Sequence, residues 1–108
     1  MDAGKAQGKM GSFKVLAHKY DIVLLQELHG HEGDLATLQK ELPTHHVFAS
    51  FGCRADVGGV LIVVRDSFMM HFRAAKATVH VQGRCMSVQF IGEGFKLLVT
   101  NIRPWWWM

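Results

Sequence analysis

The chain has 108 residues and a mass of 12.1 kDa, and 49% of its residues are hydrophobic. This composition is typical of one globular domain, and it excludes the disordered, collagen-like and low-complexity classes. The net charge of +3 is compatible with a phosphate-bearing partner such as nucleic acid but does not require one. No apolar run reaches the length of about 20 residues that a membrane-spanning helix needs.

The first elements expected along the chain are a tail, a helix and a strand. Residues 1–11 are rich in glycine and lack periodicity, so we expect a flexible tail. Ser12 is a good N-cap for a short helix, because apolar side chains follow it at helical spacing. Residues 22–25 form a continuous apolar run that predicts a strand buried on both faces, and the polar residues Gln26 and Glu27 end it.

A second helix is expected over residues 34–42, where leucines form one stripe and acidic residues lie near the N-terminal end. Pro43 ends it, because the residue before a proline is displaced from helical geometry. The next two segments, 46–51 and 59–65, are rich in β-branched and aromatic residues, so both are predicted strands.

Three further features complete the expected strand order. Residues 76–82 and 84–91 alternate in polarity around a turn at Gln82 and Gly83, with Met86, Val88 and Phe90 on one face of the second strand. A glycine-containing loop at 92–94 connects this strand to a last strand at 95–102. The order predicts an α/β fold: a mixed, largely antiparallel sheet with helices on one face.

Glu27 is the first candidate functional residue. A carboxylate directly after a buried strand lies at the edge of a sheet, where ligands of α/β proteins tend to bind. The alternative is a glutamate that faces solvent at the end of the strand and has no function.

A zinc site built from histidines and cysteines is a second possibility. Its potential ligands are His29, His31, His45, His46, Cys53 and Cys85. The tight Cys-x-x-Cys or His-x-x-x-His pairs that preorganise zinc sites are absent, so we expect adventitious nickel or zinc binding at most. The two cysteines are expected to be reduced and buried in an intracellular protein, cytoplasmic or nuclear, since no apolar segment resembling a secretory signal follows the N-terminal lysines.

Three segments resemble, in the same order, motifs of the endonuclease/exonuclease/phosphatase superfamily, which has the DNase-I-like fold. They are DIVLLQE at 21–27, GGVLIVVR at 58–65, and 84–102 with its final LVTNI. The resemblance covers residues 12–103. It implies an N-terminal part of the domain, with about one of the two sheets of the α/β sandwich.

The resemblance implies a Mg²⁺-dependent hydrolase that acts on phosphate esters of nucleic acids, inositol phosphates or lipids. Glu27 occupies the position of the metal ligand. Arg103 stands where the family has histidine or tyrosine, and because a guanidinium stays protonated, it cannot act as a base. The sequence contains neither the Gly-Asp-Phe-Asn nor the Ser-Asp-His motif that carries the family's catalytic groups.

We therefore expect a nuclease-like or phosphoesterase-like fragment that is inactive as written, with no confidently assigned catalytic residue. The alternative is a non-catalytic module that binds nucleic acid or protein on the same scaffold. Residues 104–108 contain Trp105, Trp106 and Trp107 and are interpreted as an aberrant terminus. Self-association is expected through these tryptophans and through the exposed face of a single sheet.

Overall fold

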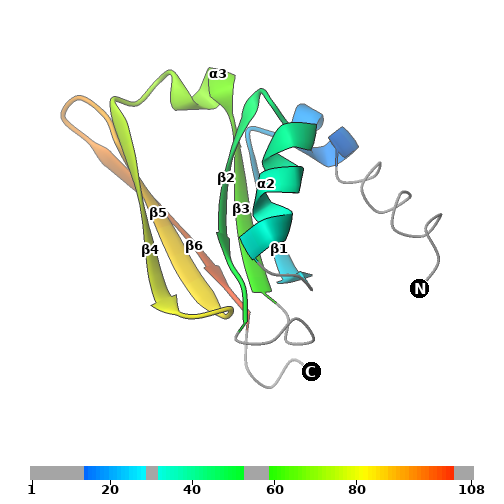
Figure 1. The fold of residues 1–108 in the computed structure, drawn as a ribbon. Coiled ribbons are helices and arrows are strands. Elements are labelled where there is room, and N and C mark those ends of the chain that lie inside the picture. The colour runs from blue at the N-terminus through cyan, green and yellow to red at the C-terminus, as the bar shows by residue number, and fades with distance from the viewer. Residues whose placement is uncertain (1–13, 29–31, 53–58, 104–108) are drawn as a thin grey trace.

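The fold consists of two three-stranded antiparallel sheets packed face to face, with helices on the outer face of the first (Figure 1). The structure is a computed structural model that describes residues 14–28, 32–52 and 59–103, without the side chains of residues 27, 28 and 32–34. The general α/β class expected from the sequence is confirmed.

The first sheet has β3 at its centre. Its order is β1-β3-β2, with β1 at Ile22–Leu28, β3 at Gly59–Arg65 and β2 at His45–Ser50. A helix over residues 14–19 and α2 (Glu32–Glu41) cover one face of this sheet. The continuous apolar sequence of β3 fits this central position, because a central strand with both faces covered has no polar side.

The second sheet follows a short helix, α3 (Asp66–Met69), and has β5 at its centre. Its strands are β4 at Ala74–Val81, β5 at Cys85–Ile91 and β6 at Lys96–Ile102. Gly83 and Gly94, in the two connecting turns, have positive φ values of 73° and 80°. Glycine adopts this left-handed conformation without the steric cost that a Cβ imposes.

Two hydrophobic layers lie on opposite faces of β3. Leu61 and Val63 pack with Leu38 and Leu42 on the helical side. Val60, Ile62 and Val64 face the second sheet, where the alternating β5 residues Met86, Val88 and Phe90 complete the layer. The prediction that these three β5 side chains share one face is therefore confirmed, and the structure shows that this face points inward.

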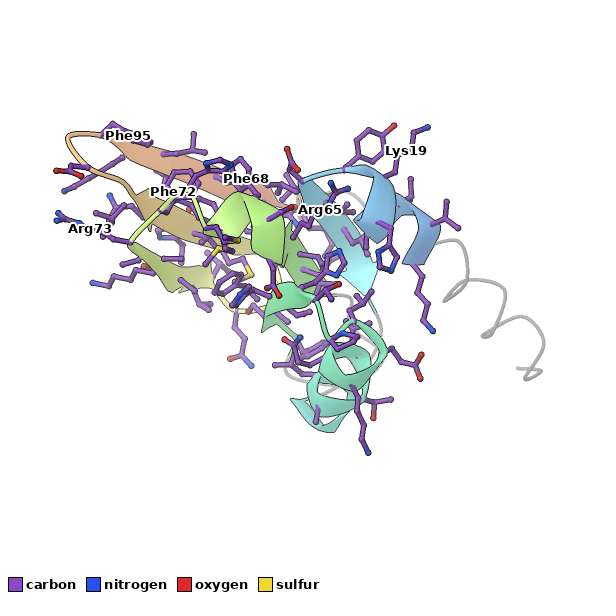
Figure 2. The ribbon with its side chains drawn as sticks, turned by 90° about the horizontal axis from the view of Figure 1, so that it is seen from above. Lys19, Arg65, Phe68, Phe72, Arg73 and Phe95 are labelled. Carbon is purple, nitrogen blue, oxygen red and sulfur yellow. The ribbon has the colours of Figure 1, made fainter. Side chains whose placement is uncertain are left out.

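Aromatic rings close the end of the sandwich at which α3 lies. The Phe72 ring centroid is 5.2 Å from that of Phe90 and 5.7 Å from that of Phe95, and Phe68 lies 5.9 Å from Phe90. Figure 2 shows Phe68, Phe72 and Phe95 gathered on this side. The strand ends that carry the candidate residues lie at the opposite end, where β1 and β6 terminate (Figure 1).

The prediction of a single mixed sheet is wrong. Antiparallel strands divide into two sheets, because the chain leaves β3 through α3 and enters β4 in a second layer. The chain therefore supplies strands to both layers of a sandwich. The prediction that β1 is buried on both faces is also wrong, since β1 is an edge strand and Leu24 is 43% exposed.

The expected elements are otherwise present with small shifts at their ends. The strand at 59–65 has the predicted bounds, and α2 begins at Glu32 and ends at Glu41, before Pro43. The four-residue helix α3 was not predicted. In the described ranges, no helix is long and apolar enough to cross a membrane. The predicted tail at 1–11 and the tryptophan-rich terminus at 104–108 lie outside the described residues.

Candidate metal and phosphate site at the ends of β1 and β6

A polar link between the two sheets fixes the ends of β1 and β6 next to each other. The Gln26 side-chain amide donates to Asn101 Oδ1 at 3.1 Å and also to the carbonyl oxygen of Ile102. Gln26 belongs to the first sheet and Asn101 to the second, so the contact joins residues that are 75 positions apart. These hydrogen bonds therefore hold the end of β1 against the end of β6.

Asn101 is the centre of this link and is only 2% exposed. Its Nδ2 donates to the carbonyl oxygens of Leu25 and Leu61, each at 2.9 Å. One buried amide therefore contacts β1 and β3 and accepts from Gln26. A buried amide with such partners is stable, whereas an unsatisfied one is costly in a dry interior.

Glu27 lies at an irregularity of β1. Gln26 pairs with Val60, but Leu28 pairs with Gly59, so Glu27 is an extra residue in the ladder. Such β-bulges bend the strand, re-aim a side chain and are over-represented beside active sites. The Glu27 side chain is outside the described part of the structure, but its backbone lies at the strand end that the sequence predicted.

Two arginines lie on neighbouring segments at this end of the second sheet. Arg103 follows β6 and is 5% exposed, and its backbone N–H donates to the carbonyl oxygen of Arg84 at 2.6 Å. Arg84 precedes β5, and its buried Nη1 has no hydrogen-bond partner among the described residues. The residues at these strand ends are therefore Gln26, Glu27, Arg84, Asn101 and Arg103, which offer two side-chain amides and two guanidinium groups besides the glutamate.

The described candidates for the alternative zinc site, His45, His46 and Cys85, do not come together at one place. His45 is buried, with Nε2 donating to the Ala17 carbonyl oxygen at 2.8 Å, and it therefore ties β2 to the helix at 14–19. His46 Nε2 lies 2.9 Å from Asp66 Oδ1, and Cys85 is half-buried and free.

No group of three potential ligands is clustered among the residues the structure describes. His29, His31 and Cys53 lie outside the described residues, so the structure gives no account of them.

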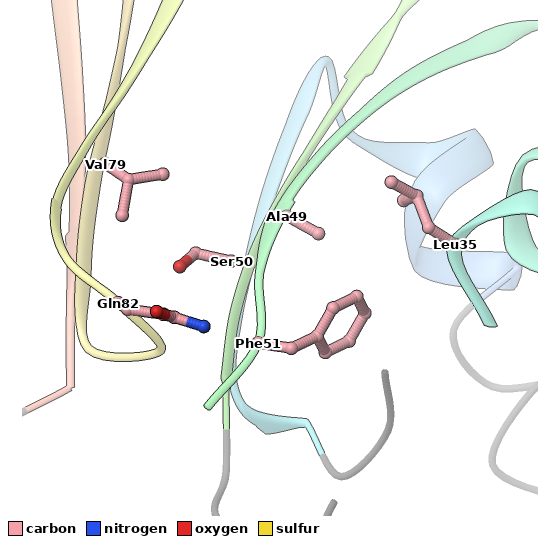
Figure 3. Close-up of a pocket in the computed structure, with 6 residues that line it drawn as sticks. All are labelled: Leu35, Ala49, Ser50, Phe51, Val79 and Gln82. Atoms are coloured by element: carbon pink, nitrogen blue, oxygen red, sulfur yellow. The ribbon is translucent and has the colours of Figure 1, made fainter. Parts of the chain in front are cut away.

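A hollow of about 600 Å³ opens beside the same end, between β2 and the β4–β5 turn (Figure 3). Its lining residues are Leu35, Ala49, Ser50, Phe51, Val79 and Gln82. Ser50 Oγ already accepts the Gly83 N–H at 2.8 Å. Among the described residues that line the hollow, no side chain is charged.

Sequence reasoning missed the contributions of Gln26, Asn101 and Arg84. Gln26 and Asn101 both lie inside the motifs quoted above. Each is a polar residue within a largely apolar strand, and this pattern could have identified them. A second missed feature is a hydrogen-bonded chain on the outer face of the second sheet. There His80 Nε2 lies 2.9 Å from Ser87 Oγ, which lies 2.8 Å from Thr100 Oγ1.

Comparisons of the chain with protein-family models, with curated proteins and with solved structures find no match. The likeness to the endonuclease/exonuclease/phosphatase superfamily therefore rests on the three sequence segments.

Proposed function

We propose that this chain carries the glutamate-bearing part of a Mg²⁺-dependent phosphoesterase or nuclease centre at the ends of β1 and β6. The carrying observation is the link from Gln26 to Asn101, with its 3.1 Å hydrogen bond. It supports the proposal because it brings the strand end with Glu27 beside the strand end with Arg103. These are the two positions at which the family resemblance expects groups of the active centre.

The residue types at this end suit a weak Mg²⁺ site. Magnesium prefers oxygen ligands, and it is commonly held by one or two carboxylates together with water and substrate phosphates. Glu27 would supply the carboxylate, and the side-chain oxygen of the adjacent Gln26 could serve as a neutral oxygen ligand. When bound, the ion would polarise a phosphoryl oxygen and offset its negative charge.

Hydrolysis also requires a base that activates the attacking water. Arg103 cannot serve as that base, because its guanidinium stays protonated. The positive charges of Arg103 and Arg84 could instead bind phosphate oxygens through charge-assisted hydrogen bonds. We therefore propose that the 108 residues bind the ion but do not turn over a phosphate ester by themselves.

The first test is an NMR titration of the chain with MgCl₂. The backbone amide signals of Gln26, Leu28 and Arg103 are expected to shift, and Glu27→Gln should abolish these shifts, because it removes the charge while preserving the side-chain shape. Glu93→Gln, in the exposed β5–β6 turn at the other end of the second sheet, is the matched control and should leave the shifts unchanged.

Shifts that persist in Glu27→Gln, or that occur elsewhere in the chain, would contradict the proposal. Unfolding curves of both variants check that the fold is retained. A plasmid-nicking assay then tests turnover. Mg²⁺-dependent nicking that Glu27→Ala abolishes would show that this chain needs no further catalytic group.

A non-catalytic nucleic-acid-binding module is the second candidate, and a charge asymmetry favours it. Residues 72–103 carry a single acid, Glu93, against the basic residues Arg73, Lys76, Arg84, Lys96 and Arg103. A locally basic region suits a phosphate backbone. Binding that weakens steeply with salt, without Mg²⁺ dependence and without nicking, would support this candidate over the first.

A further inference from the structure

Among the described residues, no strand pairs with the outer edge of β4. β4 pairs with β5 on one side only, and Figure 1 shows no other element beside it. Ala75 is half-buried and every other residue of the strand is exposed. An open edge presents unpaired N–H and C=O groups that can pair with a further strand.

The β2 edge of the first sheet is partly capped. The Gln39 side chain, from α2, donates to the His45 carbonyl oxygen at 2.6 Å and accepts the Val47 N–H at 3.3 Å. This side chain therefore occupies two of the outward backbone groups of β2. In the described part of the chain, no side chain binds the outward backbone groups of β4 in this way. The β4 edge is therefore more available for strand pairing than the β2 edge.

The two faces of β4 differ in chemistry. Ala75, Ala77 and Val79 share the face of β5 that carries Phe90, Val88 and Met86. The first sheet does not cover this part of β4, and Val79 is 50% exposed. Lys76, Thr78 and His80 alternate with them on the outer face. A strand added here would place alternate side chains against an apolar face and against a polar face that carries the Lys76 ammonium.

The stretch between Asp66 and Glu93 contains basic but no acidic side chains. Residues 67–92 contain Arg73, Lys76 and Arg84 together with His71 and His80, and no aspartate or glutamate. Figure 2 shows Arg73 at the side of the second sheet away from the helices. Opposite charges on directly paired strands stabilise a sheet, and like charges destabilise it.

We propose that the β4 edge is a docking site for an extended acidic peptide segment of another protein, which adds to the second sheet as a fourth strand. Acidic side chains of the segment lie opposite Lys76, and apolar side chains lie beside Val79. The backbone ladder supplies affinity and the alternating side chains supply selectivity, as in other complexes formed by strand addition.

Charge disfavours the other occupants of this edge. A second copy of β4 would bring two Lys76 side chains and two Arg73 side chains to one short interface. The chain's own termini do not fit either, because residues 1–13 are basic overall and residues 104–108 contain no acid. The interaction is independent of Glu27 and of metal binding.

The test uses three fluorescein-labelled decapeptides and the full chain. The first alternates glutamate and valine, the second has lysine in place of each glutamate, and the third is the glutamate peptide with N-methylated backbone. Fluorescence anisotropy should give binding of the first peptide about tenfold or more tighter than that of the other two. Amide hydrogen exchange should slow at outward-facing amides of β4 when the first peptide is bound.

Lys76→Glu should weaken binding of the glutamate peptide by about fivefold or more. Lys40→Glu, an exposed lysine on α2, is the matched control and should leave binding unchanged. Equal binding of the N-methylated peptide would overturn the proposal, because charge attraction without a backbone ladder would then suffice. Equal binding of the lysine peptide, or protection of β4 amides by self-association alone, would overturn it as well.

Discussion

Asn101 is the residue that connects the two sheets, and its role can be tested by isosteric substitution. Its amide donates to the Leu25 and Leu61 carbonyl oxygens at 2.9 Å each. Asn101→Ala removes these two hydrogen bonds and the acceptor of the Gln26 amide, so we expect it to lower the free energy of unfolding by about 2 kcal/mol. Asn101→Asp keeps the shape but cannot donate when ionised, and it should cost at least as much at neutral pH.

Urea unfolding monitored by circular dichroism measures both effects, with Lys96→Ala at the exposed start of β6 as the control. A loss below about 0.5 kcal/mol, the usual scale for exposed substitutions, would show that the link contributes little.

Gly83 is required by its conformation and by its surroundings. Its φ is 73°, and a Cβ at this position would lie 2.7 Å from Gly52 Cα, which belongs to the backbone and cannot rotate away. We expect Gly83→Ala to lower the free energy of unfolding by about 2 kcal/mol or more. Gly94 has a φ of 80° but open space around it, so Gly94→Ala should cost only about 1 kcal/mol.

Thermal or urea unfolding of the two glycine variants separates the steric contribution from the conformational one. Equal losses would mean that the approach to Gly52 relaxes without cost, and that only the left-handed conformation matters at Gly83.

At the scale of elements, an ion pair joins the helix at 14–19 to the end of α2. The Lys14 ammonium donates to the Glu41 carboxylate, and this hydrogen bond, together with the positive charge, lowers the pKa of Glu41. The pair therefore stabilises the fold above the ordinary carboxyl pKa, and this stabilisation is lost as the pH falls through the lowered pKa. Lys14→Ala should raise the Glu41 pKa toward its ordinary value.

An NMR pH titration of the Glu41 side-chain carbon measures this pKa directly. Lys40→Ala, which removes the neighbouring lysine of α2, should raise it less. An unchanged Glu41 pKa in Lys14→Ala would show that the ion pair does not persist in solution.

Elements were predicted well where local pattern and tertiary environment agree. The apolar run of β3 and the alternation of β5 identified both strands and grouped Met86, Val88 and Phe90 on one face. A strand buried on both faces is apolar throughout, whereas a strand buried on one face alternates. β1 has the same local pattern as a central strand but lies at an edge, and no local signal distinguishes the two. The four-residue α3 is too short to produce helical periodicity.

At the scale of the whole molecule, the division into two layers was not predictable from single segments. Whether β4 pairs with β2 or starts a second sheet depends on where α3 directs the chain, and on which face of β3 remains to be covered. The position of Glu27 at a strand end was predicted, whereas its bulge required the register of β1 against β3. The Gln26–Asn101 contact could not be predicted, because it spans both layers.

The second layer also changes the reason for expecting self-association. The inner faces of β3 and β5 cover each other, although most of β4 stays exposed. The association expected from a single uncovered sheet must therefore come from smaller surfaces. On the outer face of the second sheet, Leu98 is 61% exposed and Ile102 is 55% exposed. These side chains, together with the tryptophans at 105–107, remain candidates for contacts between copies.

We therefore expect light scattering at increasing concentration to give a mass above the 12.1 kDa of one chain. The double variant Leu98→Lys and Ile102→Lys should reduce this mass if the sheet face drives association, because buried lysines without partners oppose contact. Substitution of the three tryptophans by serine should reduce it if the terminus drives association. A constant mass of one chain in the unmodified protein would contradict both routes, and would leave the β4 edge as the interaction surface for other proteins.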